Sequence, residues 1–427
     1  MNTFDILEQL ARYEVGTSRR LHLIASENPL DSDTRVPYML PGTMARYAFG
    51  EPGQHNWAWP GRETIIDLEA ETAAALGALL GTQHVNLRPI SGLSAMTIAL
   101  SALAEHAGDK ATVLSLAESD GGHGSTRFVA QRFGLDWQRL PVEPATGAID
   151  LDALARQARA TGLLVLYLDA FMARFPFDLT GIRAAVGDSA LIHYDGSHPL
   201  GLIAGDQFQN PLADGADSLG GSVHKTWPGP VGKGIVATND PALAARFDTH
   251  AAGWVSHHHP ADLAALALST AWMQQHARDY AAAVIANAAH LATELAVGGL
   301  PVCADERGAT ASHQIWVDIA PICPAAVAAQ RLYDAGIVVN AIDIPGLSEP
   351  GLRLGVQELT RWGLDRDATT VLAAVLAKLL AQGVSASAVA AEVQALREQL
   401  TSPEDRQGTD ELAGFLRASD RQEVGVA

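Results

Sequence analysis

Short apolar runs alternate with longer amphipathic stretches through the first 240 residues of this 427-residue chain. Strands are predicted at His84–Leu87, Ala111–Leu116, Leu163–Asp169, Ala190–Asp195, Ser218–Val223 and Gly234–Thr238. Helices are predicted between them, at Ile65–Leu80, Ala95–Ala107 and Leu151–Ala160. Strand–helix–strand units give parallel pairs, so the alternation indicates a mostly parallel sheet with helices on both faces. Ligands of such sheets bind beyond the carboxyl ends of the strands.

The pattern changes after about residue 260, where strands become sparse. A long helix is predicted at Ala261–Val297, with Gly298-Gly299 ending it. Strands at His313–Ile319, Ile337–Ala341 and Leu352–Gly355 and a helical stretch at Ala368–Leu400 then predict a smaller α+β unit. We therefore expect an N-terminal arm (1–45), a large domain (46–280) and a small C-terminal domain (281–427).

Charge and composition argue against several classes of partner. The formal net charge of −19 disfavours nucleic acid and anionic membranes. No run reaches the roughly 18 uninterrupted apolar residues of a membrane span, and the N-terminus lacks an apolar signal-like core. The two cysteines form no disulfide framework, and His257–His259 lack a partner at metal-binding spacing. We expect a cytoplasmic protein without a metal.

A lysine and an aspartate at two predicted strand ends carry the strongest chemical signal. Lys225 lies on a loop between Gly220-Gly221 and Pro228-Gly229-Pro230, where a constrained lysine can form a Schiff base. Asp195 ends an apolar strand, where a buried carboxylate needs a partner. A helix N-cap or a structural ion pair would supply one, and so would a protonated pyridine nitrogen. Together the two residues suggest pyridoxal 5′-phosphate (PLP).

Two Gly-containing loops add to this signal. Arg88 to Ala95 includes Ser91, Gly92 and Leu93 and opens a helix, where free N–H groups and the helix dipole favour a phosphate. An ordinary serine N-cap is the structural alternative. His123 follows Gly121-Gly122 and could stack on a flat cofactor ring, or it could be an exposed histidine on a polar turn.

Arg353 lies in the apolar run Gly351-Leu352-Arg353-Leu354-Gly355. A guanidinium there suits bidentate binding of a substrate carboxylate. The alternative is a surface arginine on a strand.

Six motifs in order make the chain resemble the serine hydroxymethyltransferase family of fold-type-I PLP enzymes. They are Leu23–Asn28, Pro89–Gly92, Gly121–His123, Asp195–His198 with Gly201-Leu202, His224–Thr226 with Gly229-Pro230, and Leu352–Gly355 with Thr360–Gly363. The resemblance implies an α/β fold with a mostly parallel seven-stranded sheet sandwiched by helices, plus a smaller α+β C-terminal domain.

The resemblance also implies residue roles. Catalytic roles fall on Lys225, His123, Asp195 and His224. Contacts with PLP fall on Ser91, Gly92, Leu93, His123, Asp169, Asp195, His198, Ser222 and Lys225. Contacts with the substrate fall on Ser26, Glu27, Tyr47, Trp59 and Arg353. The family's oligomers imply a homodimer or homotetramer, with Tyr47 and the Asn56–Gly61 stretch reaching the neighbour's site.

Departures from the family pattern point to one branch. Tyr47-Ala48-Phe49-Gly50 stands where the family has Tyr-Ala-Glu-Gly, and Phe49 cannot transfer a proton. Gly355-Val356-Gln357 replaces Gly-Thr-Pro. The pattern is more similar to the threonine transaldolases. The resemblance implies a PLP-dependent enzyme that cleaves L-threonine by a retro-aldol step and releases acetaldehyde. The remaining glycyl quinonoid would then add to a second aldehyde and give a β-hydroxy-α-amino acid.

Several alternatives stay open at this stage. The chain could be a tetrahydrofolate-dependent serine or α-methylserine hydroxymethyltransferase, a simple threonine aldolase, or a PLP-binding protein without catalysis. The base could be His123, His224 or Glu27. The acceptor aldehyde is not specified by the shared motifs.

Overall fold

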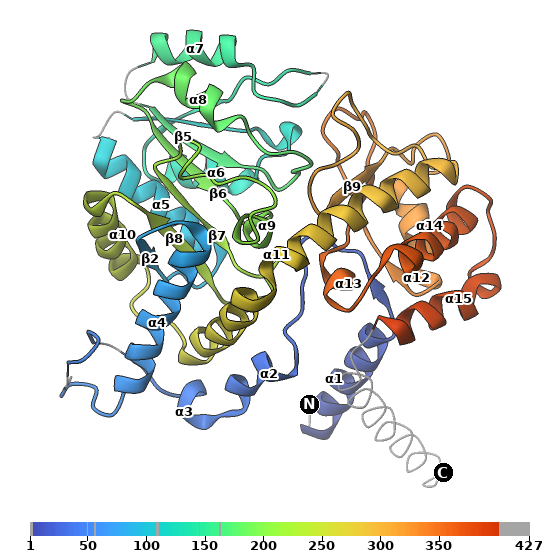
Figure 1. Ribbon diagram of the computed structural model, residues 1–427, viewed down its shortest axis with the longest axis horizontal. Coiled ribbons are helices and arrows are strands. Elements are labelled where there is room, and N and C mark those ends of the chain that lie inside the picture. Colours follow the sequence, from blue (N-terminus) through green and yellow to red (C-terminus); the bar gives the residue numbers. More distant parts are fainter. Residues whose placement is uncertain are drawn as a thin grey trace.

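A computed structural model describes residues 3–48, 50–54, 57–107, 111–144, 146–161 and 164–400. A seven-stranded sheet forms its centre, with strands in the order β2-β8-β7-β6-β5-β3-β4 (Figure 1). These strands are β2 (His84–Asn86), β8 (Gly234–Thr238), β7 (Ser218–Ser222), β6 (Leu191–Asp195), β5 (Leu164–Asp169), β3 (Thr112–Ser115) and β4 (Asp136–Arg139). Only β8 runs antiparallel to its neighbours, so the predicted mostly parallel sheet is confirmed.

Alternate residues of the strands face two different helical layers. On β5, Leu166 and Leu168 belong to one buried cluster, whereas Val165 and Tyr167 belong to another. The first cluster lies with α4 (Glu63–Leu80), α7 (Leu151–Ala160), α8 (Leu179–Val186) and α9 (Leu200–Ala204). The second lies with α5 (Gly92–Ala107), α6 (Gly124–Arg132) and α10 (Pro241–Trp254). Both faces are therefore buried, as the apolar strands require.

The long helix α11 (Pro260–Val297) runs from the large sheet to the C-terminal part of the chain (Figure 1). By length and composition it could cross a membrane. Its apolar residues, however, contact α4 and α9 at one end and α13 (Gln357–Arg361) and α14 (Arg366–Leu380) at the other. A core helix that joins two parts of one fold accounts for this apolar character.

The smaller sheet has the order β11-β12-β9 and packs against α12 (Ala325–Asp334) through β11 and β12, and α14 packs in turn on α12. Its strands are β9 (Gln314–Val317), β11 (Asn340–Ile342) and β12 (Gly351–Gly355), all antiparallel. The N-terminal helix α1 (Thr3–Ser18) leads into β1 (Leu21–His22), which pairs with β10 (Ile337–Val338). Short helices at Ser32–Arg35 (α2), Val36–Met39 (η1), Pro41–Met44 (α3) and Glu118–Asp120 (η2) complete the described elements. The division into three domains, with its two boundaries, stays a prediction.

The sequence pattern missed three features of this fold. β4 was not predicted, because Asp136-Trp137-Gln138-Arg139 is a polar edge strand without an apolar run. The single strand predicted at Ile337–Ala341 is two strands, since β10 pairs with β1 and β11 pairs with β12. The predicted helix at Ala368–Leu400 is divided into α14 and α15 (Ala386–Gln399) by a turn with Gly383 at φ +66°.

Candidate active site

Three polar side chains meet where neighbouring strands of the large sheet end. Asp169 ends β5, Asp195 ends β6 and Ser222 ends β7. Asp169 is the direct register partner of Asp195, and Asp195 is the partner of Gly220. Ser222 is 27 positions from Asp195 and 53 positions from Asp169 in the chain, yet all three residues lie at the carboxyl edge of the sheet. Parallel topology predicts this arrangement.

Lys225 lies three residues beyond the end of β7, beside these groups. Its Nζ donates a hydrogen bond to Ser222 Oγ. Its backbone carbonyl accepts a bond from Asn28 Nδ2 at 2.8 Å, which ties the lysine loop to the N-terminal segment. Burial lowers the pKa of Lys225 to about 8, and the carboxylate of Asp195 partly opposes this shift. A lysine held this way has more of its amine in the nucleophilic, neutral form.

Asp195 has two donors of its own. Tyr167 Oη donates to Oδ2 and the Ser197 N–H donates to Oδ1, both at 2.9 Å. Gly221 runs past this carboxylate at φ +130°, and a side chain on it would come within 2.8 Å of Asp195 Oδ1. Only glycine fits there, so the backbone of β7 and the carboxylate lie in direct contact. The arrangement fixes the carboxylate while leaving it available to a cation.

Asp169 organises the loop of His123. Its Oδ2 accepts bonds from the His123 N–H (3.1 Å) and from the hydroxyl of Thr126. Its Oδ1 is buried without a partner, and burial raises the pKa of the carboxyl well above its usual range. His123 itself is exposed and caps α6, with Nδ1 accepting from the Ser125 N–H at 3.3 Å. The imidazole is therefore anchored through its backbone and turned toward open space.

The loop before α5 reaches the end of β7. Ser91 and Ser94 bond each other reciprocally, each hydroxyl accepting from the other residue's N–H at 2.9–3.0 Å. A side chain on Gly92 would come within 3.1 Å of Ser222 Cβ. Gly92 and Leu93 open a 16-residue helix whose first N–H groups and dipole favour an anion. These two residues and Ser91 therefore lie beside the lysine loop, as predicted.

Arg353 approaches the site from the smaller sheet. Nε and Nη2 both donate to Asn340 Oδ1, at 3.2 and 2.9 Å, and Nη1 donates to the carbonyl of Phe171 at 3.1 Å. Burial lowers the pKa of Arg353 to about 10. Nη1 also donates to Met172 Sδ, a weak acceptor, at 3.7 Å, which leaves one N–H on Nη2 for a further partner. A buried guanidinium whose end has one open N–H and one weakly bonded N–H is suited to a carboxylate.

His198 is buried near both Lys225 and Arg353, whose positive charges act on its imidazole. Its Nδ1 lies 3.3 Å from His313 Nε2 and 3.1 Å from Gln314 Nε2, and the two imidazoles stack with centroids 5.5 Å apart. Burial lowers the pKa of His198 well below 6.5 and that of His313 to about 3. Both rings are therefore neutral, and they add hydrogen-bonding capacity without positive charge.

The remaining predicted residues lie nearer the surface. Glu27 is exposed, with its carboxylate 3.9 Å from His22 Nδ1. The ring of Tyr47 packs on Trp59 at 5.7 Å and on His257 at 4.2 Å between centroids. Ser26, which immediately precedes Glu27, is half-buried. Phe49 lies outside the described residues.

The model of the family described as serine hydroxymethyltransferase matches residues 2–376, which is most of the chain. The chain belongs to the serine hydroxymethyltransferase family. It is an enzyme of the transferase class with the fold-type-I architecture, so the predicted family and fold are confirmed.

Relatives from two branches of the family are similar to this chain. An L-threonine:uridine-5′-aldehyde transaldolase of Amycolatopsis sp is 38% identical over 80% of this chain and 83% of its own length. A serine hydroxymethyltransferase of Methanopyrus kandleri is 34% identical over 92% and 93%. Among solved structures, an L-threonine transaldolase from Pseudomonas fluorescens in its internal aldimine state gives a TM-score of 0.82 at 27% identity, covering 92% of this chain and 91% of that one.

Three site residues escaped the sequence analysis. His313, Asn340 and Asn28 contact His198, Arg353 and the lysine loop respectively. Asn28 belonged to a recognised motif but had no assigned role. His313 and Asn340 stand at the edges of predicted strands of the small domain, and nothing in their local sequence indicates that β9 and β11 meet the large sheet. Their roles follow from tertiary contacts alone.

Proposed function

We propose that this member of the serine hydroxymethyltransferase family is a PLP-dependent L-threonine transaldolase. The observation that carries the choice is Phe49, which stands where a carboxylate would serve the folate-dependent reaction. The chain is also similar in sequence and in structure to threonine transaldolases, and this similarity supports the transaldolase branch of the family. Similarity to serine hydroxymethyltransferases is nearly as high, so the reaction has to be tested directly.

The described residues fit PLP. Lys225 is a half-buried lysine with a lowered pKa, Asp195 is held by two donors, and the start of α5 offers backbone donors for a phosphate. The buried, unpartnered Oδ1 of Asp169 and Nδ1 of His224 leave polar atoms for a bound molecule. When bound, PLP would be held by Lys225 and would supply an electron sink for cleavage at the amino acid's Cα–Cβ bond.

Each side chain then has a distinct task. Arg353, with Ser26, would bind the carboxylate of threonine and so orient the Cα–Cβ bond for cleavage. Asp195 would hold a proton on the ring nitrogen, and His123 would lie over the ring. His198 and Ser222 would contribute further contacts to the cofactor, since Ser222 ends β7 and His198 follows β6 by three residues.

The base for the β-hydroxyl proton is best assigned to His224. His123 Nδ1 accepts from the Ser125 N–H, which places the proton of the neutral ring on Nε2 and makes that atom a donor. Glu27 is exposed and lies close to His22. His224 is mostly buried, its pKa is lowered to about 4 by burial, and its Nδ1 has no partner, so the neutral ring can accept a proton.

The proposal includes a homodimer or homotetramer. Trp57 is 81% exposed, and Met39, Met44, Tyr47 and Trp59 are also exposed large side chains on the segment before α4. This segment projects from the large domain (Figure 1). An exposed set of apolar and aromatic residues is typical of a subunit contact. The cytoplasmic location stays a prediction.

The test is incubation of the holoenzyme with L-threonine, with and without an acceptor aldehyde. We expect acetaldehyde release and a new β-hydroxy-α-amino acid only when the acceptor is present, with no dependence on tetrahydrofolate. Acetaldehyde and glycine formed at the same rate without an acceptor would indicate a simple aldolase. A tetrahydrofolate-dependent exchange of serine and glycine would indicate a hydroxymethyltransferase.

A further inference from the structure

A short segment, Phe171–Arg174, follows β5 and lies between the loop of His123 and the smaller sheet. The Met172 N–H donates to the carbonyl of Gly121 at 3.2 Å, two residues before His123. The ring of Phe171 packs edge-on against the imidazole of His123, with centroids 6.3 Å apart. The segment therefore touches the His123 loop both through its backbone and through a side chain.

The same segment holds the guanidinium of Arg353. The carbonyl of Phe171 accepts from Arg353 Nη1 at 3.1 Å, and Met172 Sδ accepts from the same nitrogen at 3.7 Å. That carbonyl also accepts from Gln314 Nε2 at 2.9 Å, so donors from β12 and from β9 meet on one oxygen. A carbonyl oxygen has two lone pairs, and both are used here. A shift of this segment would therefore displace the predicted carboxylate-binding arginine.

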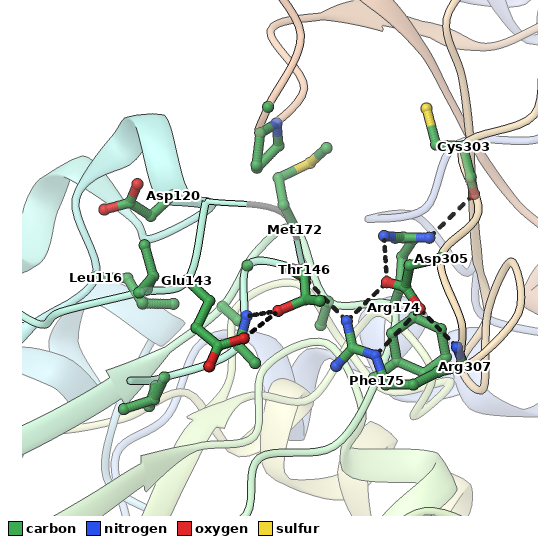
Figure 2. Close-up of a pocket in the computed structure, with 18 of the residues that line it drawn as sticks. Leu116, Asp120, Glu143, Thr146, Met172, Arg174, Phe175, Cys303, Asp305 and Arg307 are labelled. Carbon is green, nitrogen blue, oxygen red and sulfur yellow. Dashed lines mark hydrogen bonds and ion pairs between the residues drawn. The ribbon is translucent and has the colours of Figure 1, made fainter. Parts of the chain in front are cut away.

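Arg174 anchors the segment to loops of the C-terminal part of the chain (Figure 2). Its Nη1 donates to the carbonyls of Cys303 and Ala309, both at 3.0 Å, and its Nη2 donates to Asp305 at 3.2 Å. The side chains of Arg174 and Asp305 are each only 10% exposed. Release of this guanidinium would leave three acceptors without their donor, so the anchor is costly to break.

A second contact leads from Arg174 toward Arg353. The guanidinium carbon of Arg174 lies 4.7 Å from the ring centroid of Trp316. Trp316 on β9 is the direct register partner of Arg353 on β12, and side chains of paired residues lie on the same face of a sheet. Arg174 thus holds both the segment that bonds Arg353 and the side chain beside it.

We propose that Arg174 is a positioning residue for substrate binding. It fixes the segment Phe171–Arg174 so that the Phe171 carbonyl aligns the Arg353 guanidinium for a carboxylate. Arg174 acts through Phe171 and Trp316 and makes no contact with the substrate itself. The inference rests on the carboxylate-binding role that the proposed function gives to Arg353.

Arg307 offers a matched control. Arg174 and Arg307 both line a cavity of about 930 Å³ between these loops (Figure 2). Both bond the carboxylate of Asp305, and both lie over the ring of Phe175, at 5.2 and 4.2 Å from its centroid. Arg307, however, donates to the carbonyl of Thr146 at 2.8 Å instead of anchoring the segment. The same substitution at the two arginines therefore separates the anchor from its surroundings.

The test compares binding of glycine and of methylamine to the holoenzyme, followed by the absorbance of the cofactor. The two ligands differ by the carboxylate. Arg174→Met should weaken glycine binding by at least about fivefold and leave methylamine binding unchanged, because only glycine uses Arg353. Arg307→Met should leave both affinities unchanged. Arg174→Lys keeps a charged donor at the anchor and should restore part of the glycine affinity.

Ser312→Ala tests the segment without changing Arg174. Ser312 Oγ donates to the carbonyl of Ala173 at 2.6 Å, within the same segment. We expect this variant to lose at least about twofold in glycine affinity and none in methylamine affinity. Amide hydrogen exchange of the holoenzyme should rise severalfold in peptides that cover residues 171–174 in Arg174→Met, and it should stay unchanged in Arg307→Met.

The possible failures are distinguishable. An unmodified holoenzyme that binds glycine no better than methylamine would overturn the carboxylate role of Arg353 and, with it, the proposed function. A preference for glycine that persists in Arg174→Met and in Ser312→Ala would overturn the role of Arg174 alone. Equal losses for the two ligands, or unchanged hydrogen exchange in Arg174→Met, would do the same. Should Arg174→Met not fold, Ser312→Ala decides between these outcomes.

Discussion

Asp169 and Asp195 are direct register partners at the ends of two parallel strands, yet their carboxyl groups lie in different environments. Asp195 is bonded by Tyr167 and by the Ser197 N–H, whereas one oxygen of Asp169 is buried without a partner. Burial and the neighbouring Asp195 raise the pKa of Asp169. Two adjacent carboxyl groups with different environments can hold different protonation states. Burial therefore favours the protonated form of Asp169, and in the proposed function Asp195 is the residue that faces the cation of the cofactor.

Asparagine substitutions should separate the two aspartates. Asp195→Asn removes the charge that would hold the ring nitrogen protonated, so we expect kcat to fall by roughly 100-fold or more, with a shifted visible absorbance of the cofactor. Asp169→Asn keeps an acceptor for the His123 N–H and Thr126, so we expect a loss of less than about tenfold. Steady-state kinetics and absorbance spectra measure both. Equal losses in the two variants would contradict the assignment.

The second prediction concerns Arg353 and its partner Asn340. Arg353→Lys removes the two-pronged donor, so the KM for threonine should rise at least roughly tenfold while PLP stays bound. Asn340→Ala removes the acceptor of Nε and Nη2 and should raise KM by a smaller factor with kcat little changed, because it loosens the guanidinium. Cofactor absorbance serves as the control. A fall in kcat alone, with KM unchanged, would refute a role in carboxylate binding.

The third prediction follows from the lowered pKa of Lys225. Below about pH 8 this amine is protonated and cannot attack a carbonyl, and above about pH 8 it is neutral. The rate at which apoenzyme takes up PLP should therefore rise with pH with a midpoint near pH 8, well below the value of 10.5 for an ordinary lysine, and reach its plateau above that midpoint. Asp195 raises the pKa of Lys225, so Asp195→Asn should move the plateau to lower pH. A plateau that moves upward would contradict this.

The fourth prediction concerns the stability contributed by Glu358, which is buried in α13. Burial raises the pKa of its carboxyl from 4.5 to about 8. Between these two values the folded protein binds more protons than the unfolded chain, so this group makes the protein less stable as pH rises through that window. Glu358→Gln should remove this effect. The difference in free energy of unfolding between Glu358→Gln and the wild type, measured by urea denaturation, should therefore change with pH. From about pH 5 to about pH 8.5 it should grow by on the order of 2 kcal/mol in favour of the variant. A pH-independent difference would contradict it.

Local sequence was sufficient where one residue type has one physical role. Helix Leu151–Ala160 was predicted with its bounds, because Asp150 caps it and its apolar face is regular. Lys225 and Asp195 were predicted because a lysine between Gly-rich and Pro-rich segments and an acid at the end of an apolar strand are unusual. β4 was missed because an edge strand need not be apolar.

The sequence by itself therefore determined the strand–helix alternation and the family motifs, including those that carry Lys225, Asp195 and Arg353, whose roles stay predictions. The sequence did not determine which atoms hold these side chains. Arg353 donates to Asn340, which carries no local signal, and Asn28 donates to the lysine loop, which is distant in the chain. The cavity lined by Met172 and Cys303 was decided only by tertiary structure, since its lining residues come from loops of the large sheet and from loops of the C-terminal part of the chain. Charge balance inside that cavity depends on which arginines already have partners, and only the folded arrangement fixes those partners.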